Sequence, residues 1–113
     1  MTKTHNQLPQ VAFSILLALS LRERHGYEII KQVAEDSNGK IHLGPGPLYT
    51  SIKQLLEQKL VEEVEKTEDS RRRYYRLSKK GRTALVAELD YYRNTITLAQ
   101  ERQVLEILYG ISY

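Results

Sequence analysis

The chain has 113 residues and no cysteine, which fits one domain and excludes disulfides and thiolate metal sites. Its net charge of +3 is small, but residues 71–82 hold seven Lys or Arg and no acidic side chain. Residues 11–21 form an apolar run that is too short to span a membrane and lacks the flanks of a signal peptide. These features predict a cytoplasmic protein without a membrane partner.

A first helix is predicted over Pro9–Arg22, where apolar residues occur on nearly every side. A helix without a polar face is buried on more than one side, and in so small a chain this suggests a partner chain. Residues 22–25 are predicted to form a charged break before a second helix over Tyr27–Asp36. Asn38 or Gly39 is expected to end that helix in a left-handed conformation.

The third predicted helix ends near Leu60, and its lead-in at residues 44–47 is expected to stay non-helical until Pro47. Its apolar positions form one core-facing stripe, namely Leu48, Ile52, Leu55 and Leu56. The opposite face carries short or hydrogen-bonding side chains, which suits contact with DNA, although a plain solvated face is the alternative. The candidates for contact with base edges on that face are Thr50, Ser51, Lys53 and Gln54. Tyr49, at the edge of the stripe, is expected to point its hydroxyl outward and contact a phosphate.

A basic hairpin is predicted next, with strands over Leu60–Lys66 and Arg72–Leu77. Glu63 or Glu65 of the first strand could pair with Arg72 or Arg76 across the hairpin, which would leave Arg71 and Arg73 unpaired. The three consecutive arginines Arg71, Arg72 and Arg73 are therefore expected to contact phosphates or reach a minor groove.

Ser78 is a suitable N-cap for a last helix that starts at Lys79. Apolar residues along this helix alternate four and three apart, as in a heptad seam. A homodimer interface is predicted between this seam and the first helix, with the members Phe13, Leu16, Leu17, Leu85, Leu89, Tyr92 and Ile96. Residues 94–97 have low helix propensity, so a kink or a break there is left open.

Catalysis finds no support in the sequence. His5, His25 and His42 are far apart and lack ligand spacing, and no nucleophile motif or phosphate-binding glycine loop is present. We therefore expect no enzyme activity, no metal and no cofactor.

Three stretches together resemble one known family. They are Ile15–Leu19 with His25–Ile29, Gly46–Tyr49 with Leu55 and Leu60–Val61, and Arg72–Ser78 with Gly81. In this order and spacing, the chain resembles the PadR family of bacterial winged helix-turn-helix transcriptional regulators, in the short form with a single C-terminal helix. Pro47 departs from the family, which usually has Thr or Ser there, and removes a capping hydroxyl.

The resemblance implies a mainly α fold with a small β-hairpin (α+β). Residues 1–78 would form the winged helix-turn-helix and residues 79–113 a C-terminal dimerisation helix, within one compact domain. The third helix would recognise DNA, the hairpin would be the wing, and the first and last helices would pack across a dimer two-fold. The candidate DNA contacts are then Tyr27, Tyr49, Thr50, Ser51, Lys53, Gln54, Arg71, Arg72 and Arg73.

The predicted function is sequence-specific regulation of transcription, as a repressor on double-stranded DNA with an inverted repeat. The resemblance also implies release by a small, often aromatic effector at the dimer interface, for which Phe13, Tyr91 and Tyr92 are the available rings. The same rings could simply be dimer core. The alternative function is a winged-helix module whose basic wing binds an acidic protein partner without reading DNA sequence.

Overall fold

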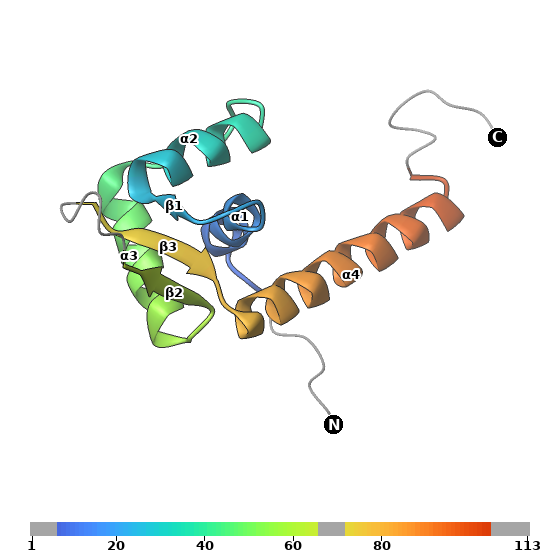
Figure 1. Ribbon diagram of the computed structural model, residues 1–113. Coiled ribbons are helices and arrows are strands. Elements are labelled where there is room, and N and C mark those ends of the chain that lie inside the picture. Colours follow the sequence, from blue (N-terminus) through green and yellow to red (C-terminus); the bar gives the residue numbers. More distant parts are fainter. Residues whose placement is uncertain (1–6, 66–71, 105–113) are drawn as a thin grey trace. The chain divides into compact units, whose positions relative to one another are not determined.

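The computed structural model describes residues 7–65 and 72–104 of the chain (Figure 1). Its elements in order are α1 (Gln10–Leu19), β1 (Arg24–His25), α2 (Gly26–Asp36), α3 (Pro45–Glu57), β2 (Val61–Val64), β3 (Tyr74–Leu77) and α4 (Lys79–Glu101). The predicted class, mainly helical with a small antiparallel sheet, is confirmed. None of these helices is long and apolar enough to cross a membrane.

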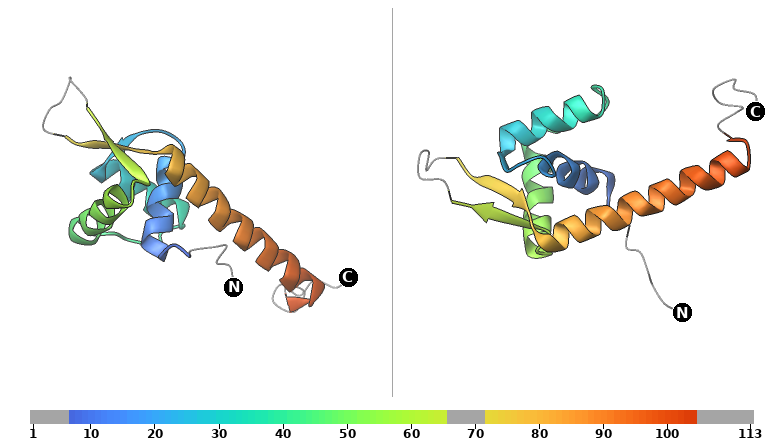
Figure 2. Two further views of the ribbon diagram at one scale, coloured as in Figure 1. Left: turned by 90° about the horizontal axis from the view of Figure 1, so that it is seen from below. Right: turned by 45° about the vertical axis from the view of Figure 1, so that its right-hand side comes forward.

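The chain divides into two compact units. The N-terminal unit comprises Leu8–Leu85, and the C-terminal unit includes the rest of α4 from Val86 onward. In the N-terminal unit α1, α2 and α3 pack against one another, and β2 and β3 lie beside them (Figure 2). Ile15 and Leu16 of α1, Ile29 of α2 and Leu48 of α3 are all fully buried in its core. Each such side chain contributes about 1.5–3 kcal/mol by leaving water.

The sheet has three antiparallel strands in the order β1-β3-β2. Its third strand, β1, corrects the sequence prediction, which treated residues 22–25 as a charged break. Both residues of β1, Arg24 and His25, are buried. Burial of the Arg24 cation is compensated because its Nε donates to the carbonyl of Ala18 at 3.0 Å. A charged segment that was predicted to be a break between helices is therefore a short buried strand.

Helix α3 begins at Pro45, so the prediction of a non-helical lead-in up to Pro47 was wrong by two residues. The first N–H groups of any helix have no partner within it, so prolines in the first turn lose no hydrogen bond. Gly46, between them, has no Cβ to clash with the ring of Pro47. The first bond of the helix runs from the N–H of Leu48 to the carbonyl of Gly44 at 3.1 Å.

Other boundaries are shorter than predicted. Helix α1 stops at Leu19 rather than Arg22, and the two wing strands cover Val61–Val64 and Tyr74–Leu77. The left-handed end of α2 is confirmed, with positive φ at both Asn38 and Gly39. Predicted features at residues 66–71, Arg71 among them, lie outside the described residues.

The junction between the wing and α4 is tightly built. Ser78 caps α4 as predicted, because its Oγ accepts the N–H of Gly81 at 2.9 Å. The same hydroxyl donates to the carbonyl of Lys59 at 2.7 Å, which ties the end of α3 to the start of α4. A Cβ at Gly81 would collide with the carbonyl oxygen of Leu60, so only glycine fits there. Helix α4 then continues through residues 94–97 without a break.

Candidate nucleic-acid interface

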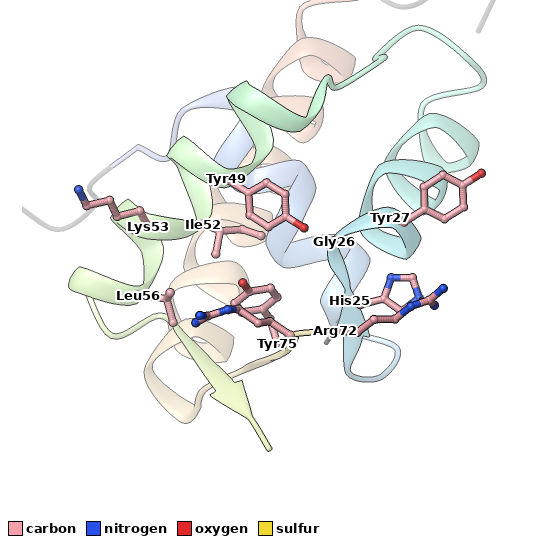
Figure 3. A pocket seen from close by; sticks show the side chains of 10 residues that line it. His25, Gly26, Tyr27, Tyr49, Ile52, Lys53, Leu56, Arg72 and Tyr75 are labelled. Atoms are coloured by element: carbon pink, nitrogen blue, oxygen red, sulfur yellow. The ribbon is translucent and has the colours of Figure 1, made fainter. Parts of the chain in front are cut away.

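An open pocket of about 600 Å³ lies between the start of α2, the outer face of α3 and the start of β3 in the wing (Figure 3). Its lining residues are His25, Gly26, Tyr27, Tyr49, Ile52, Lys53, Leu56, Arg72, Arg73 and Tyr75. Among these described residues are three cations and no carboxylate. A concave surface of one charge sign attracts the opposite charge, so this pocket favours an anion such as a phosphate.

Tyr49 of α3 crosses toward the first residue of α2. Figure 3 shows its hydroxyl directed at Gly26, where a Cβ would collide with that hydroxyl. Glycine therefore allows the two helices to approach at this point. The prediction that the hydroxyl of Tyr49 faces outward was wrong, although the ring is half exposed, as expected for a residue at the stripe's edge.

The wing arginines are held by different partners. Arg73 Nη1 lies 3.4 Å from Glu63 Oε1, so the expectation that Arg73 stays unpaired was wrong. Arg76 Nε donates to Glu62 Oε1 at 2.9 Å, so a cross-strand pair forms at Arg76, but with Glu62 rather than the expected Glu63 or Glu65. Both pairs are exposed and contribute little to stability, so Arg73 can exchange Glu63 for an anion in the pocket.

The floor of the pocket is neutral. Tyr75 is 3% exposed, and its burial, with the nearby Glu63 carboxylate, raises the pKa of its phenol above the usual range. The ring therefore stays uncharged and does not repel an anion bound above it. Ile52 and Leu56 supply the apolar part of the same floor.

His25 lies where β1 joins α2, and it has neighbours on both of its edges. Its Nδ1 lies 3.3 Å from the N–H of Glu28, whose carboxylate accepts the His25 backbone N–H at 3.2 Å, as in a capping box. Its Nε2 lies 2.8 Å from Nη1 of Arg72, which comes just before β3 at the turn end of the wing. The ring of Tyr74 meets the imidazole edge-on at 5.3 Å.

Burial of Glu28 by itself raises the pKa of its carboxyl group. The hydrogen bond from His25 and the guanidinium of Arg22, 3.4 Å away, outweigh that effect. The pKa of Glu28 therefore lies below its usual 4.5, and the carboxylate that caps α2 is ionised at neutral pH.

Three predicted DNA contacts, namely Thr50, Ser51 and Gln54, lie along α3 and outside the pocket. Thr50 and Gln54 are exposed, and Ser51 is partly exposed. At the start of α2, Tyr27 is 67% exposed, and Figure 3 shows its hydroxyl pointing away from the pocket. The pocket thus brings together five predicted contacts, namely Tyr27, Tyr49, Lys53, Arg72 and Arg73.

Sequence reasoning missed three residues of this surface: His25, Gly26 and Tyr75. His25 and Gly26 belong to a stretch that carried the family resemblance, and this was the available signal. Only the pairing of β1 with β3 places His25 opposite Tyr74 and beside Arg72, and short strands of charged residues are not recognisable from periodicity.

The residues predicted for a dimer interface fall into two groups. Leu16 and Leu85 are buried in the core of the N-terminal unit, while Phe13 and Leu17 are partly exposed. On the C-terminal part of α4, Leu89 is 38% and Ile96 is 52% exposed. The interface stays a prediction, and the exposed members are those that can still meet a partner.

The aromatic residues predicted for an effector site are divided between the units. Tyr91 and Tyr92 of α4 meet edge-to-face with ring centroids 5.7 Å apart. Burial and a hydrogen bond with Glu88 raise the pKa of the Tyr92 phenol. Phe13 belongs to α1 in the N-terminal unit. Effector binding by these rings stays a prediction.

Comparison with known families identifies the chain. Residues 15–87 match the model of the transcriptional regulator PadR-like family, and this stretch covers α1 to the start of α4. The chain belongs to the PadR-like family. The resemblance inferred from three short stretches is therefore confirmed, and the family is one of transcriptional regulators rather than enzymes. A comparison with curated proteins finds no match.

Solved structures agree with the PadR-like assignment. A PadR family transcription regulator from Clostridium difficile has a TM-score of 0.71 and 25% identity, covering 82% of this chain and 97% of that one. RosR from H. salinarum has a TM-score of 0.69 and 26% identity, covering 91% of each chain. The adhesin competence repressor AdcR from Streptococcus pyogenes, at 18% identity and a TM-score of 0.61, shares the fold, covering 93% of this chain and 77% of its own.

Proposed function

We propose that this PadR-like regulator binds an inverted repeat in double-stranded DNA as a homodimer and represses transcription until a small molecule releases it. Helix α3 would enter the major groove, and the wing would rest on the adjacent phosphates or in the minor groove. The observation that carries the proposal is the cationic pocket that joins Lys53 on α3 to Arg72 and Arg73 at the wing. Recognition helix and wing thus present one continuous anion-binding surface.

The polar face of α3 supports reading of sequence rather than backbone binding alone. Lys53 can donate to guanine, and Gln54 can form two hydrogen bonds to adenine. Thr50, which is exposed one turn earlier, presents a hydroxyl and a methyl group to the same groove. The core stripe of Leu48, Ile52 and Leu55 holds these side chains outward on a fixed helix.

Dimerisation would rest on the exposed apolar side chains of α4, such as Leu89 and Ile96. A two-fold dimer places two α3 helices on one side of the duplex, about one helical turn or a multiple of it apart, so the operator should be an inverted repeat. A ligand at such an interface could favour a second dimer form in which the two α3 helices are spaced differently. It can shift the equilibrium between the two forms only as far as its affinity for them differs.

Selection of bound duplexes from random DNA tests this function. We expect one enriched motif with two-fold symmetry and an affinity that falls steeply with salt concentration. Enrichment of no motif, together with an affinity independent of salt, would favour the protein-binding alternative. A reporter driven by the selected motif should rise when the chain is deleted, and an unchanged reporter would argue against repression.

Repeating the selection with a panel of small aromatic compounds tests release by a ligand. Loss of the bound duplex with one compound would support an effector. Unchanged binding with the whole panel would argue against an aromatic one.

A further inference from the structure

We propose that His25 is a positioning residue for DNA binding, which holds the guanidinium of Arg72 through Nε2 while Nδ1 carries the ring proton. This inference rests on the proposed DNA-binding function and adds a role for a residue that itself reads no base. The ring is buried, so the imidazole provides a fixed point beside the start of β3. Figure 3 shows it lying against the side chain of Arg72 beside the pocket.

The choice of ring proton follows from counting lone pairs. A neutral imidazole has one acceptor nitrogen, yet two donors approach it: Arg72 at Nε2 and the N–H of Glu28 at Nδ1. The contact with Arg72 is 2.8 Å and has a charged donor, whereas the contact with Glu28 is 3.3 Å. Charge-assisted hydrogen bonds are shorter and stronger, so the lone pair belongs to Nε2.

The surroundings of the ring agree with this arrangement. A carboxylate oxygen, Glu28 Oε1, is 3.7 Å from Nε2, which is too far for it to replace Arg72 as a hydrogen-bond partner there. Tyr74, the β3 partner of His25, stands edge-on to the ring, and Tyr27 lies roughly parallel to it at 6.5 Å. Two aromatic neighbours therefore restrict rotation of the imidazole.

The contact leaves Arg72 able to bind a phosphate. A guanidinium has five N–H donors, His25 contacts one of its nitrogens, and Arg72 itself lines the pocket. A long side chain that is ordered before binding loses less rotamer entropy when the complex forms. Fixing one such side chain corresponds to a roughly threefold to tenfold gain in affinity.

The tautomer can be measured on the protein without DNA. Ring ¹⁵N chemical shifts of the neutral imidazole should show that His25 carries its proton on Nδ1. In Arg72→Met, which keeps an apolar stem without donors, the proton should move to Nε2 so that Nδ1 accepts the N–H of Glu28. The exposed His42 provides the internal control, and its signals should not change. A proton on Nε2 in the wild type, or no change in Arg72→Met, would overturn the contact.

The effect on DNA is tested by a double-mutant cycle on the selected duplex. His25→Asn places a favourable N-capping residue at this position but does not hold Arg72, and it should weaken binding roughly threefold to tenfold. In an Arg72→Met background the same change should have no further effect. Equal affinity of His25→Asn and wild type, or equal losses in both backgrounds, would overturn the positioning role. A wild type that binds no duplex would instead overturn the proposed function, which the tautomer measurement does not depend on.

Discussion

At the scale of single residues, the cations of the wing differ in where their charge can be used. Arg73 lines the pocket and makes a long, exposed contact with Glu63. Arg76 lies further along the same strand region, but it is paired with Glu62 at 2.9 Å and does not line the pocket. The two arginines therefore form a matched pair for testing phosphate contact.

Arg73→Ala should weaken binding to every duplex alike and lower the slope of log affinity against log salt by about one ion, because one phosphate contact is lost. Arg76→Ala should leave both the affinity and the slope close to wild type. Fluorescence anisotropy titrations over a series of salt concentrations measure both quantities. A loss restricted to the selected motif would mean that Arg73 reads sequence.

Gln54→Ala tests base reading. Its exposed side chain lies outside the pocket, so its removal should spare the general affinity for DNA. We expect a cost of about 1–3 kcal/mol at one base pair in each half-site, because an adenine contact is lost. Repeating the duplex selection with this variant should show relaxed preference at that position. An unchanged motif would exclude Gln54 from recognition.

The residues that could be predicted from sequence are those whose role follows from the helical repeat. Spacing alone placed Leu48, Ile52 and Leu55 in the core and Lys53 outside it. By contrast, the pairing of Arg73 with Glu63 depends on strand register, and the inward hydroxyl of Tyr49 depends on the missing side chain at Gly26. Both are contacts between elements, which no local pattern encodes.

At the scale of elements, the helices were predictable in number and order because their apolar periods are clear. The ends of the helices were less predictable, because caps and backbone contacts determine them. Helix α3 starts at Pro45, two residues earlier than predicted, because proline suits a first turn. Helix α1 ends at Leu19, before the chain enters the sheet as β1. Strand β1 has only two residues and exists through its pairing with β3. A strand this short has no period to detect.

The junction at Gly81 gives a prediction about stability. Gly81→Ala forces a Cβ against the carbonyl of Leu60, which belongs to the backbone and cannot rotate away. The start of α4 must then shift, at a cost of about 1–3 kcal/mol or more. Urea denaturation followed by circular dichroism measures it. Thr83→Ala, an exposed change on the same helix, should be neutral or slightly stabilising; equal stability of both variants would contradict the close approach.

The cap of α2 predicts a pH effect. The folded pKa of Glu28 is depressed, so its contribution to stability is complete above the unfolded value of 4.5 and is lost as the pH falls through the folded pKa. Glu28→Gln keeps an acceptor for the His25 N–H but does not titrate. Between about pH 5.5 and about pH 3.5 the stability of wild type should fall more than that of Glu28→Gln. Parallel curves from urea denaturation would show that Glu28 is not a linked group.

At the scale of the whole molecule, the proposed homodimer places most of its apolar contact on α4. Leu89→Asp puts a charge into that surface, and burying an unpaired carboxylate is costly, so the dimer should dissociate. Binding to the inverted repeat should fall with it, since one protomer holds one half-site. Sedimentation equilibrium at micromolar concentration measures the state of association. Ala87→Asp, an exposed change two residues earlier on the helix, is the control; a wild-type monomer would contradict the dimer.

The proline-rich start of α3 has a kinetic consequence. Pro45 and Pro47 fix φ near the helical value before any contact with DNA, so the first turn of the recognition helix exists in the unbound protein. Association then requires no folding of this segment and loses little backbone freedom. Encounter should therefore proceed at a rate limited by diffusion and orientation, with discrimination between sites residing in how long the protein stays bound.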